Sequence, residues 1–238
     1  MITVIIPTLN SEATLAATLE SFIPAAVQGL VREVLIADGG SKDATLKIAD
    51  GFGATTICAG VARTDRLNAG AQQARFPWLL FVNPDCVLDA GWEREADQLL
   101  SRIAAQRCAP TAAVFRFALD DSGLAPRATE FLARWSATLF GFGHSQQGLL
   151  IPRPLYVEAG GFKSLPLLES VDLTRRVGRK RLMTFRSAVV ENATQIRQHG
   201  YMNSLVRYYG CLLLYAFNVP ANRIAKLQLA PTSQQTSI

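Results

Sequence analysis

Four short apolar runs, each followed by a polar turn and a helix-like stretch, constrain the fold of this chain more than any other feature. They lie within TVIIPTLNSEATL (3–15), within EVLIADGGSKDAT (33–45), from Ala54 to Cys58 and from Trp78 to Val82. Short strands that alternate with helical patterns are typical of βαβ units, which build a parallel sheet. The ligand crevice of such a sheet lies beyond the carboxyl ends of its strands. We therefore expect an α/β fold whose site is formed by polar residues that directly follow strands.

The order of elements changes after residue 110. From there the sequence predicts a strand at Ala112 to Phe117, a turn at Asp120 to Gly123, a long helical stretch, a Gly-rich loop and a strand at Leu149 to Pro152. We expect one continuous domain with a βα half at 1–110 and a mixed α/β half with C-terminal helices at 111–232. The polar residues 233–238 are expected to fray.

Composition excludes several classes of protein. With 238 residues, of which 49% are hydrophobic, the chain can bury a large core without metals or disulfides. Its four cysteines form no CxxC pair, which argues against zinc and fits a reducing cytosol. The net charge of +5 comes without a basic stripe interleaved with aromatics, so no nucleic-acid partner is expected. No secretion signal is recognised before the first strand at Ile2, and a cytoplasmic location is expected.

Several segments together resemble the family-2 glycosyltransferases with the GT-A fold, a Rossmann-like nucleotide-diphospho-sugar transferase fold. More narrowly, they are similar to the small bacterial branch of arsenosugar-type or general family-2 glycosyltransferases. The segments, in chain order, are IIPTLN, ADGGSKDAT, RLNAGAQQAR, LLFVNPDCVLDAGW, QGLLIPRPLYVEAGGF and LPLLESVDLTRRV. The resemblance covers nearly the whole chain. It implies that residues 1–110 bind a nucleotide sugar and that 111–232 face the acceptor.

The resemblance places the nucleotide base at the turn after the first strand and at the acid after the second. In this chain the positions are Thr8, Leu9, Asn10 and Asp38. A carboxylate that accepts from a base-ring N–H suits Asp38. The alternative is that Asp38 only opens a turn beside Gly39 and caps the next helix, as Asp-Gly sequences commonly do.

The stretch from Arg63 to Gly70 resembles the helix start that faces the nucleotide. Arg63 or Arg66 can offer a forked guanidinium to a diphosphate oxygen, and the alternative is a surface ion pair with Asp65. Asn68 and Gly70 match the family's Asn-x-Gly, in which a small residue lets backbone and nucleotide approach closely. Their alternative is simple helix packing.

The family's metal-binding Asp-x-Asp reads Asn83-Pro84-Asp85 in this chain. Asp85 is expected to hold a divalent cation, Mn²⁺ or Mg²⁺, weakly bound if at all, because one carboxylate has become an amide. Asn83 is expected to bond a ribose hydroxyl. The alternative for Asp85 is a turn residue after proline.

Two further acids of the family are replaced. Relatives carry Gly-Asp-Gln-Gly where this chain has Ser145-Gln146-Gln147-Gly148, next to His144. Relatives also take the catalytic base from a Glu-Asp pair, which reads Glu169-Ser170 here. Serine is far too weak a base for this role. Glu169 and Asp172 share a helix face and either can act as base. Their alternative is that they only complement the helix dipole.

The sequence leaves two functions open. The first is an inverting transfer of a sugar from a UDP- or GDP-type donor to a lipid, saccharide or small-molecule acceptor, with weak activity. The second is a catalytically inactive relative that binds a nucleotide, a saccharide or a partner protein, as the replacements at Asn83, Gln146 and Ser170 suggest. A nucleotidyltransferase is disfavoured, because the first strand is not followed by a Gly-rich, basic phosphate loop. A homodimer or a protein partner is a further option.

Two apolar segments near the C-terminus suggest that the protein makes peripheral contact with the inner membrane. Tyr201 to Phe217 and Asn222 to Leu229 carry interspersed Arg207, Arg223 and Lys226, as amphipathic anchors do. The alternative is packing under the sheet or against a second subunit.

Overall fold

The computed structural model describes residues 1–121, 123, 126–132, 147–165, 168–193, 210–212 and 214. The strands, in chain order, are β1 (Ile2–Thr8), β2 (Val31–Asp38), β3 (Thr55–Cys58), β4 (Trp78–Phe81), β5 (Cys86–Leu88), β6 (Ala112–Leu119), β7 (Leu149–Pro152) and β8 (Leu182–Glu191). The helices are α1 (Leu15–Glu20), α2 (Ile23–Val27), α3 (Thr45–Gly51), α4 (Arg63–Gln73), α5 (Trp92–Ala104), α7 (Arg153–Glu158), α8 (Glu169–Val177) and the 3₁₀ turn η1 (Arg179–Arg181). Residues 126–132 are also helical.

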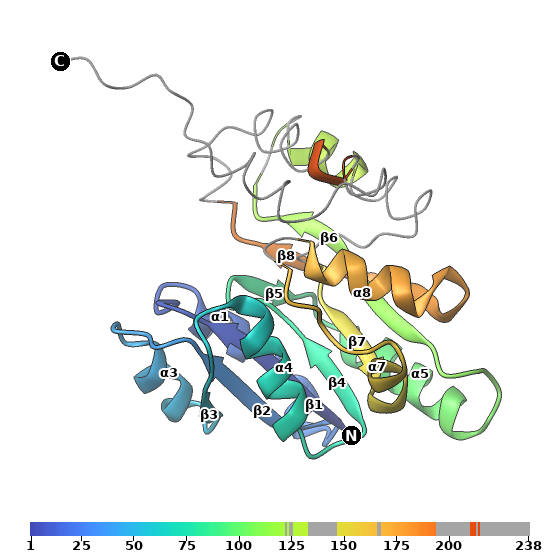
Figure 1. Ribbon diagram of the computed structural model, residues 1–238, viewed down its shortest axis with the longest axis horizontal. Helices are drawn as coiled ribbons and strands as arrows, with labels where there is room; N and C mark the ends of the chain where they lie inside the picture. Colours follow the sequence, from blue (N-terminus) through green and yellow to red (C-terminus); the bar gives the residue numbers. More distant parts are fainter. Residues whose placement is uncertain are drawn as a thin grey trace.

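All these strands join one mixed sheet in the order β3-β2-β1-β4-β7-β6-β8-β5 (Figure 1). Parallel pairing joins β3, β2, β1 and β4. Antiparallel pairing joins β7 to β4 and to β6, and the sheet then continues through β8 to β5. Because β7 pairs with β4, the predicted halves 1–110 and 111–232 share one sheet.

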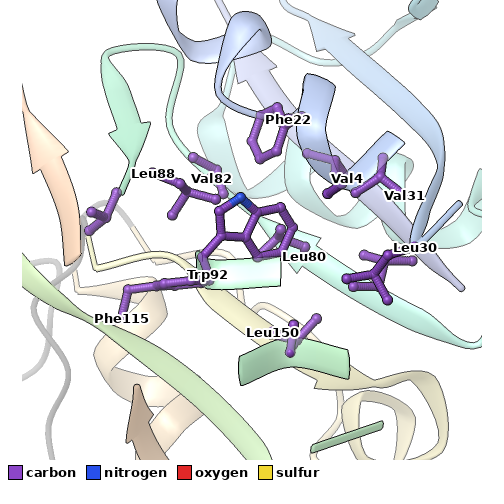
Figure 2. Close-up of a cluster of buried hydrophobic side chains, with 14 of the residues drawn as sticks. Val4, Phe22, Leu30, Val31, Leu80, Val82, Leu88, Trp92, Phe115 and Leu150 are labelled. Atoms are coloured by element: carbon purple, nitrogen blue, oxygen red, sulfur yellow. The ribbon is translucent and has the colours of Figure 1, made fainter. Parts of the chain in front are cut away.

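The strands alternate their side chains between two cores, as the period of a strand requires. On β1, Val4 and Ile6 face the core under α1, α3 and α5, whereas Ile5 faces the core under α4, α7 and α8. Trp92 stands at the centre of the first core (Figure 2). Its ring meets Phe22 edge-on at a centroid distance of 6.0 Å, a geometry that aromatic pairs favour. The two cores fix α4 and α8 on the same face of the sheet.

The predicted βα units are confirmed. Four strands fall on the predicted apolar runs within one or two residues at the carboxyl end, and β6 and β7 fall at their predicted places. The short strand β5 and the long strand β8 were not predicted. The predicted C-terminal helices and the frayed tail lie outside the described residues, apart from 210–212 and 214. Within the described part of the chain, no helix combines the length and the apolar character needed to cross a membrane.

Candidate active site

The turns after β1 and β2 are locked together at the carboxyl edge of the sheet. Asp38 is buried and its carboxylate accepts hydrogen bonds from the Thr8 hydroxyl at 2.8 Å, from the Ser41 hydroxyl at 2.6 Å, and from the Gly40 and Ser41 amides at 2.8 Å. Burial alone would raise the pKa of Asp38, but these bonds, led by those from Ser41, outweigh it and lower the pKa. Asp38 is therefore a fixed anion that shapes the turn.

Asn10 and Leu9 form the outer part of the same site. Asn10 has a φ of 52°, which asparagine tolerates better than most residues. Its amide donates to the Ser41 hydroxyl and its side-chain oxygen accepts from the Lys42 amide. Leu9 beside it is 41% exposed. An apolar side chain that is open to solvent next to two ordered polar turns suits the edge of a flat base.

Arg66 lies behind these turns. It is buried, and its Nη1 donates to the Thr8 carbonyl at 2.6 Å, while its Nε has no hydrogen-bond partner. A Cβ at Gly39 would approach the Arg66 guanidinium to 3.2 Å, so the turn and the arginine pack closely. Burial, and then the charge of Arg63, lower the pKa of Arg66, while Asp38 opposes the change. The edge thus carries two neighbouring guanidinium groups.

Arg63 joins three elements that are distant in the sequence. From the first turn of α4, its Nε donates to Glu169 Oε1 at 2.7 Å and its Nη2 donates to Asn83 Oδ1 at 2.5 Å. The Glu169 side chain is 7% exposed and that of Arg63 is 34% exposed. Glu169 opens α8 directly after Leu168, whose φ is 62°. The sequence offered Asp65 as the ion-pair partner of Arg63, and the structure gives Glu169.

A small cavity lies beside this ion pair. It has a volume of about 20 Å³, room for about one water molecule. Arg63, Asn83, Phe162, Ser170 and Thr174 are among its lining residues. With Arg63 held by Glu169 and Asn83, the crevice around these residues is nearly filled.

The second candidate base, Asp172, is engaged elsewhere. It is buried and accepts from Arg176 Nε at 2.8 Å and from Arg176 Nη2 at 2.6 Å. The same guanidinium donates to the carbonyls of Ala159 and Gly161. Asp172 and Arg176 thus tie α8 to the segment after α7. Glu169, by contrast, contacts Arg63 of the candidate site.

Asn68 and Gly70 make packing contacts, which favours the structural alternative for both. The Asn68 amide donates to the Phe162 carbonyl at 2.8 Å, and its oxygen accepts from the Tyr156 hydroxyl at 2.7 Å. A Cβ at Gly70 would lie 2.3 Å from Ile5 Cγ2, so only glycine lets α4 rest on β1 at this distance. Both residues hold α4 in place, and with it Arg63 and Arg66. A direct contact of either with a nucleotide stays a prediction.

The residues around Asp85 fit a weakly held cation at most. Asn83 Oδ1 already accepts from Arg63, and Asp85 is half-buried with its Oδ1 3.6 Å from Cys86 Sγ. Burial, followed by the charges of Asp85 and Glu191, raises the pKa of Cys86 well above its ordinary value. Among the described residues, no three His, Cys, Asp or Glu side chains are grouped to hold a metal ion. A magnesium site usually has one or two carboxylates plus substrate phosphates, and the Asn83-Pro84-Asp85 motif supplies one carboxylate, Asp85.

The predicted loop replacement is only partly visible. Gln147 is buried and its carbonyl accepts from the Phe115 amide at 3.1 Å. His144, Ser145 and Gln146 lie outside the described residues.

The fold and this edge define an α/β protein whose candidate site lies where parallel strands end. A model of the family described as Glycosyl transferase family 2 matches residues 3–162. The chain belongs to this family. A search of curated proteins found no match.

Solved structures share the GT-A fold. S. aureus TarS 1–349 matches with a TM-score of 0.61 and 15% identity, covering 87% of this chain and 63% of that one. Glucosyl-3-phosphoglycerate synthase from Mycobacterium tuberculosis, solved with Mn²⁺, UDP and glucosyl-3-phosphoglycerate, matches with a TM-score of 0.59 and 19% identity, covering 92% and 81%. TarS 1–349 with UDP-GlcNAc matches at 0.59 and 17%, covering 80% and 58%. This chain therefore spans less than two thirds of the TarS fragment. The similarity to these structures confirms the predicted GT-A fold.

Proposed function

We propose that this chain transfers a sugar, with inversion, from a UDP- or GDP-type sugar donor to a lipid, saccharide or small-molecule acceptor, at low turnover. The observation that carries the proposal is the contact of Arg63 with both Asn83 and Glu169 at the carboxyl edge of β4. This contact brings together the Arg63 guanidinium, which would bind the diphosphate, and the Glu169 carboxylate, which would face the acceptor. Membership of the family supports the same reaction class.

The donor is proposed to lie across the interlocked turns. The base would rest against Leu9 and Asn10 and meet the edge that Thr8 and Asp38 organise, and the diphosphate would point toward Arg63. Two similarly folded proteins support a nucleotide donor, because TarS was solved with UDP-GlcNAc and the synthase with UDP and Mn²⁺. For this chain, a cation would be held by Asp85 and would be weakly bound.

Glu169 is proposed as the base. The acceptor hydroxyl would give its proton to the Glu169 carboxylate while its oxygen forms a bond to the anomeric carbon. The bond from that carbon to the diphosphate oxygen would break, and the nucleoside diphosphate would leave with the electron pair. A base positioned in this way typically contributes about a hundredfold to ten-thousandfold.

The same contacts support the proposed low turnover. Glu169 Oε1 is ion-paired to Arg63 at 2.7 Å, so this oxygen is engaged with a guanidinium and not with an acceptor hydroxyl. Ser170, next to it at the cavity, cannot replace a carboxylate as base.

Calorimetric titration with UDP and with GDP, each with and without Mn²⁺, tests the donor site. Saturable binding of one nucleotide, followed by release of nucleoside diphosphate from the matching sugar donors, would support the transferase. Binding without any transfer or hydrolysis would favour the alternative, a binding module that has lost catalysis. Absence of binding in all four titrations would contradict the donor site and would leave, of the alternative, a module that binds a saccharide or a partner protein.

Asp85→Ala tests the role of the cation. We expect this variant to lose whatever part of the turnover depends on added Mn²⁺, because Asp85 is the proposed ligand. Asp97→Ala, an exposed aspartate on α5, is the matched control and should keep that part. Unchanged Mn²⁺ dependence in Asp85→Ala would show that the cation assignment is wrong.

The cytoplasmic location, contact with the inner membrane and a homodimer or protein partner stay predictions from the sequence. Liposome co-sedimentation with anionic lipid tests the membrane contact.

A further inference from the structure

Arg63 contacts the motif that stands at the place of the family's metal-binding Asp-x-Asp. Its guanidinium touches Asn83, the first residue of Asn83-Pro84-Asp85, at 2.5 Å. Asn83 is an amide, so it accepts a hydrogen bond there but has no charge with which to bind a cation. A fixed side-chain cation thus stands at one end of this motif.

The Arg63 side chain is also in a position to exchange partners. It is 34% exposed, unlike the 7% exposed side chain of Glu169 that it contacts. Moving Arg63 away costs free energy, because the buried Glu169 carboxylate loses this partner, and the contacts of the diphosphate with Arg63 have to offset that cost. A diphosphate offers the planar guanidinium several charged oxygens at once, which match its fork.

Arg66 strengthens the positive potential behind Arg63. It follows one turn later on α4, is buried, and has an Nε without a hydrogen-bond partner. Arg63 and Arg66 lie three residues apart on α4, a spacing that places two side chains on the same face of a helix. The Asp38 carboxylate opposes the effect of Arg63 on Arg66, and it accepts hydrogen bonds from Thr8, Gly40 and Ser41.

We infer that Arg63 supplies at the donor diphosphate the positive charge that a divalent cation would otherwise supply, and that donor binding moves Arg63 from Glu169. The inference rests on the proposed function, and it makes nucleotide binding independent of metal. It also couples the two roles of the site, because the Glu169 oxygen that accepts from Arg63 is released when the diphosphate takes Arg63.

This exchange predicts an effect on nucleotide affinity that would not be expected if a metal ion alone held the diphosphate. Glu169 competes with the nucleotide for Arg63, so Glu169→Gln should tighten UDP binding in EDTA by about fivefold, the value of a modest ion pair. Arg63→Gln should weaken it by at least about tenfold, because a charge-assisted forked contact is lost. Arg63→Lys keeps the charge without the fork and should lie between wild type and Arg63→Gln.

The test is calorimetric titration of UDP and GDP into the full chain and these variants, first in EDTA and then with excess Mn²⁺. Arg75→Gln is the matched control. Arg75 also pairs with a buried glutamate, Glu33, at 2.5 Å, but near the start of β2, away from Asp38. Thermal unfolding of each variant shows whether it is folded.

The inference is supported if a nucleotide binds in EDTA, Glu169→Gln binds it more tightly, Arg63→Gln binds it more weakly and Arg75→Gln matches wild type. Binding that requires Mn²⁺ and is unaffected by Arg63→Gln would overturn the inference and leave the donor site intact. Absence of UDP and GDP binding under every condition would overturn the donor site as well.

Discussion

Two carboxylates at the same edge of the sheet are held in opposite ways. Asp38 accepts four hydrogen bonds from uncharged groups, and all four come from its own turn or from β1 beside it. Glu169 is held by Arg63, a cation on another helix. Asp38 is therefore built into the local fold, whereas Glu169 depends on a partner that a ligand can take. The fixed turn suits recognition and the exchangeable pair suits chemistry.

The largest expected effect is on turnover. Glu169→Gln should lower the rate of nucleoside diphosphate release to acceptor by about a hundredfold to ten-thousandfold, because a general base is lost. Its nucleotide affinity should not fall. Steady-state kinetics measures the change in turnover, and calorimetry measures nucleotide affinity separately. Asp172→Asn is the comparison variant, and it should affect stability more than the rate at saturating donor. Equal rates for Glu169→Gln and wild type would remove Glu169 from the reaction.

The next largest effect is on stability, when the buried carboxylate of Asp38 is removed. Asp38→Ala should lower the free energy of unfolding by about 3 kcal/mol, because several buried donors lose a charged acceptor. Urea unfolding measures it. Asp50→Ala, an exposed aspartate on α3, should stay within about 0.5 kcal/mol of wild type. Similar values for both variants would show that Asp38 is not the structural centre of the turn.

A smaller effect is expected where α4 rests on β1. Gly70→Ala should cost about 1–3 kcal/mol, because its Cβ would lie 2.3 Å from Ile5 Cγ2 and must push α4 outward. Arg63 moves with the helix, so nucleotide affinity should fall too. Gly51→Ala on α3 meets no atom within 4 Å and is the control. If Gly70→Ala is as stable as Gly51→Ala, the close packing is not real.

The smallest effect is a dependence on pH. The pKa of Asp38 is lower in the folded chain, so its stabilisation is present above the ordinary aspartate pKa of about 4 and is lost as pH falls through the lower folded value. Glu33 and Glu95 also have lowered pKa values and add to the same acid loss. Melting temperatures between neutral pH and pH 3 should therefore fall less steeply for Asp38→Asn than for wild type. Parallel curves would contradict the assignment.

The sequence predicts well the features that depend on local patterns, which are the first four strands and the turns that end them. Each of the first four strands is an apolar run that ends at a polar turn, so Thr8, Asp38 and Asn83 could be placed at one edge before any contact was known. The strand β5 was missed because Cys86–Leu88 is only three residues long, and β8 because its interior includes Arg186 and Ser187.

The ion pair between Arg63 and Glu169 could not be predicted in the same way. Arg63 and Glu169 are 106 residues apart, and no local pattern selects Glu169 over the neighbouring Asp65. Likewise, the spacing of Glu169 and Asp172 places them on one helix face, but only the fold shows that Asp172 is bound by Arg176. Long-range pairing of charges is decided by packing of the whole chain, not by the segments that carry them.

A crystal structure of the protein with UDP in the absence of metal tests this account most directly. The account predicts the base at the turns of Thr8 and Asp38, the diphosphate against Arg63, and Glu169 released from its ion pair. A nucleotide bound elsewhere, or one bound at this edge while Arg63 still contacts Glu169 and Asn83, would contradict it.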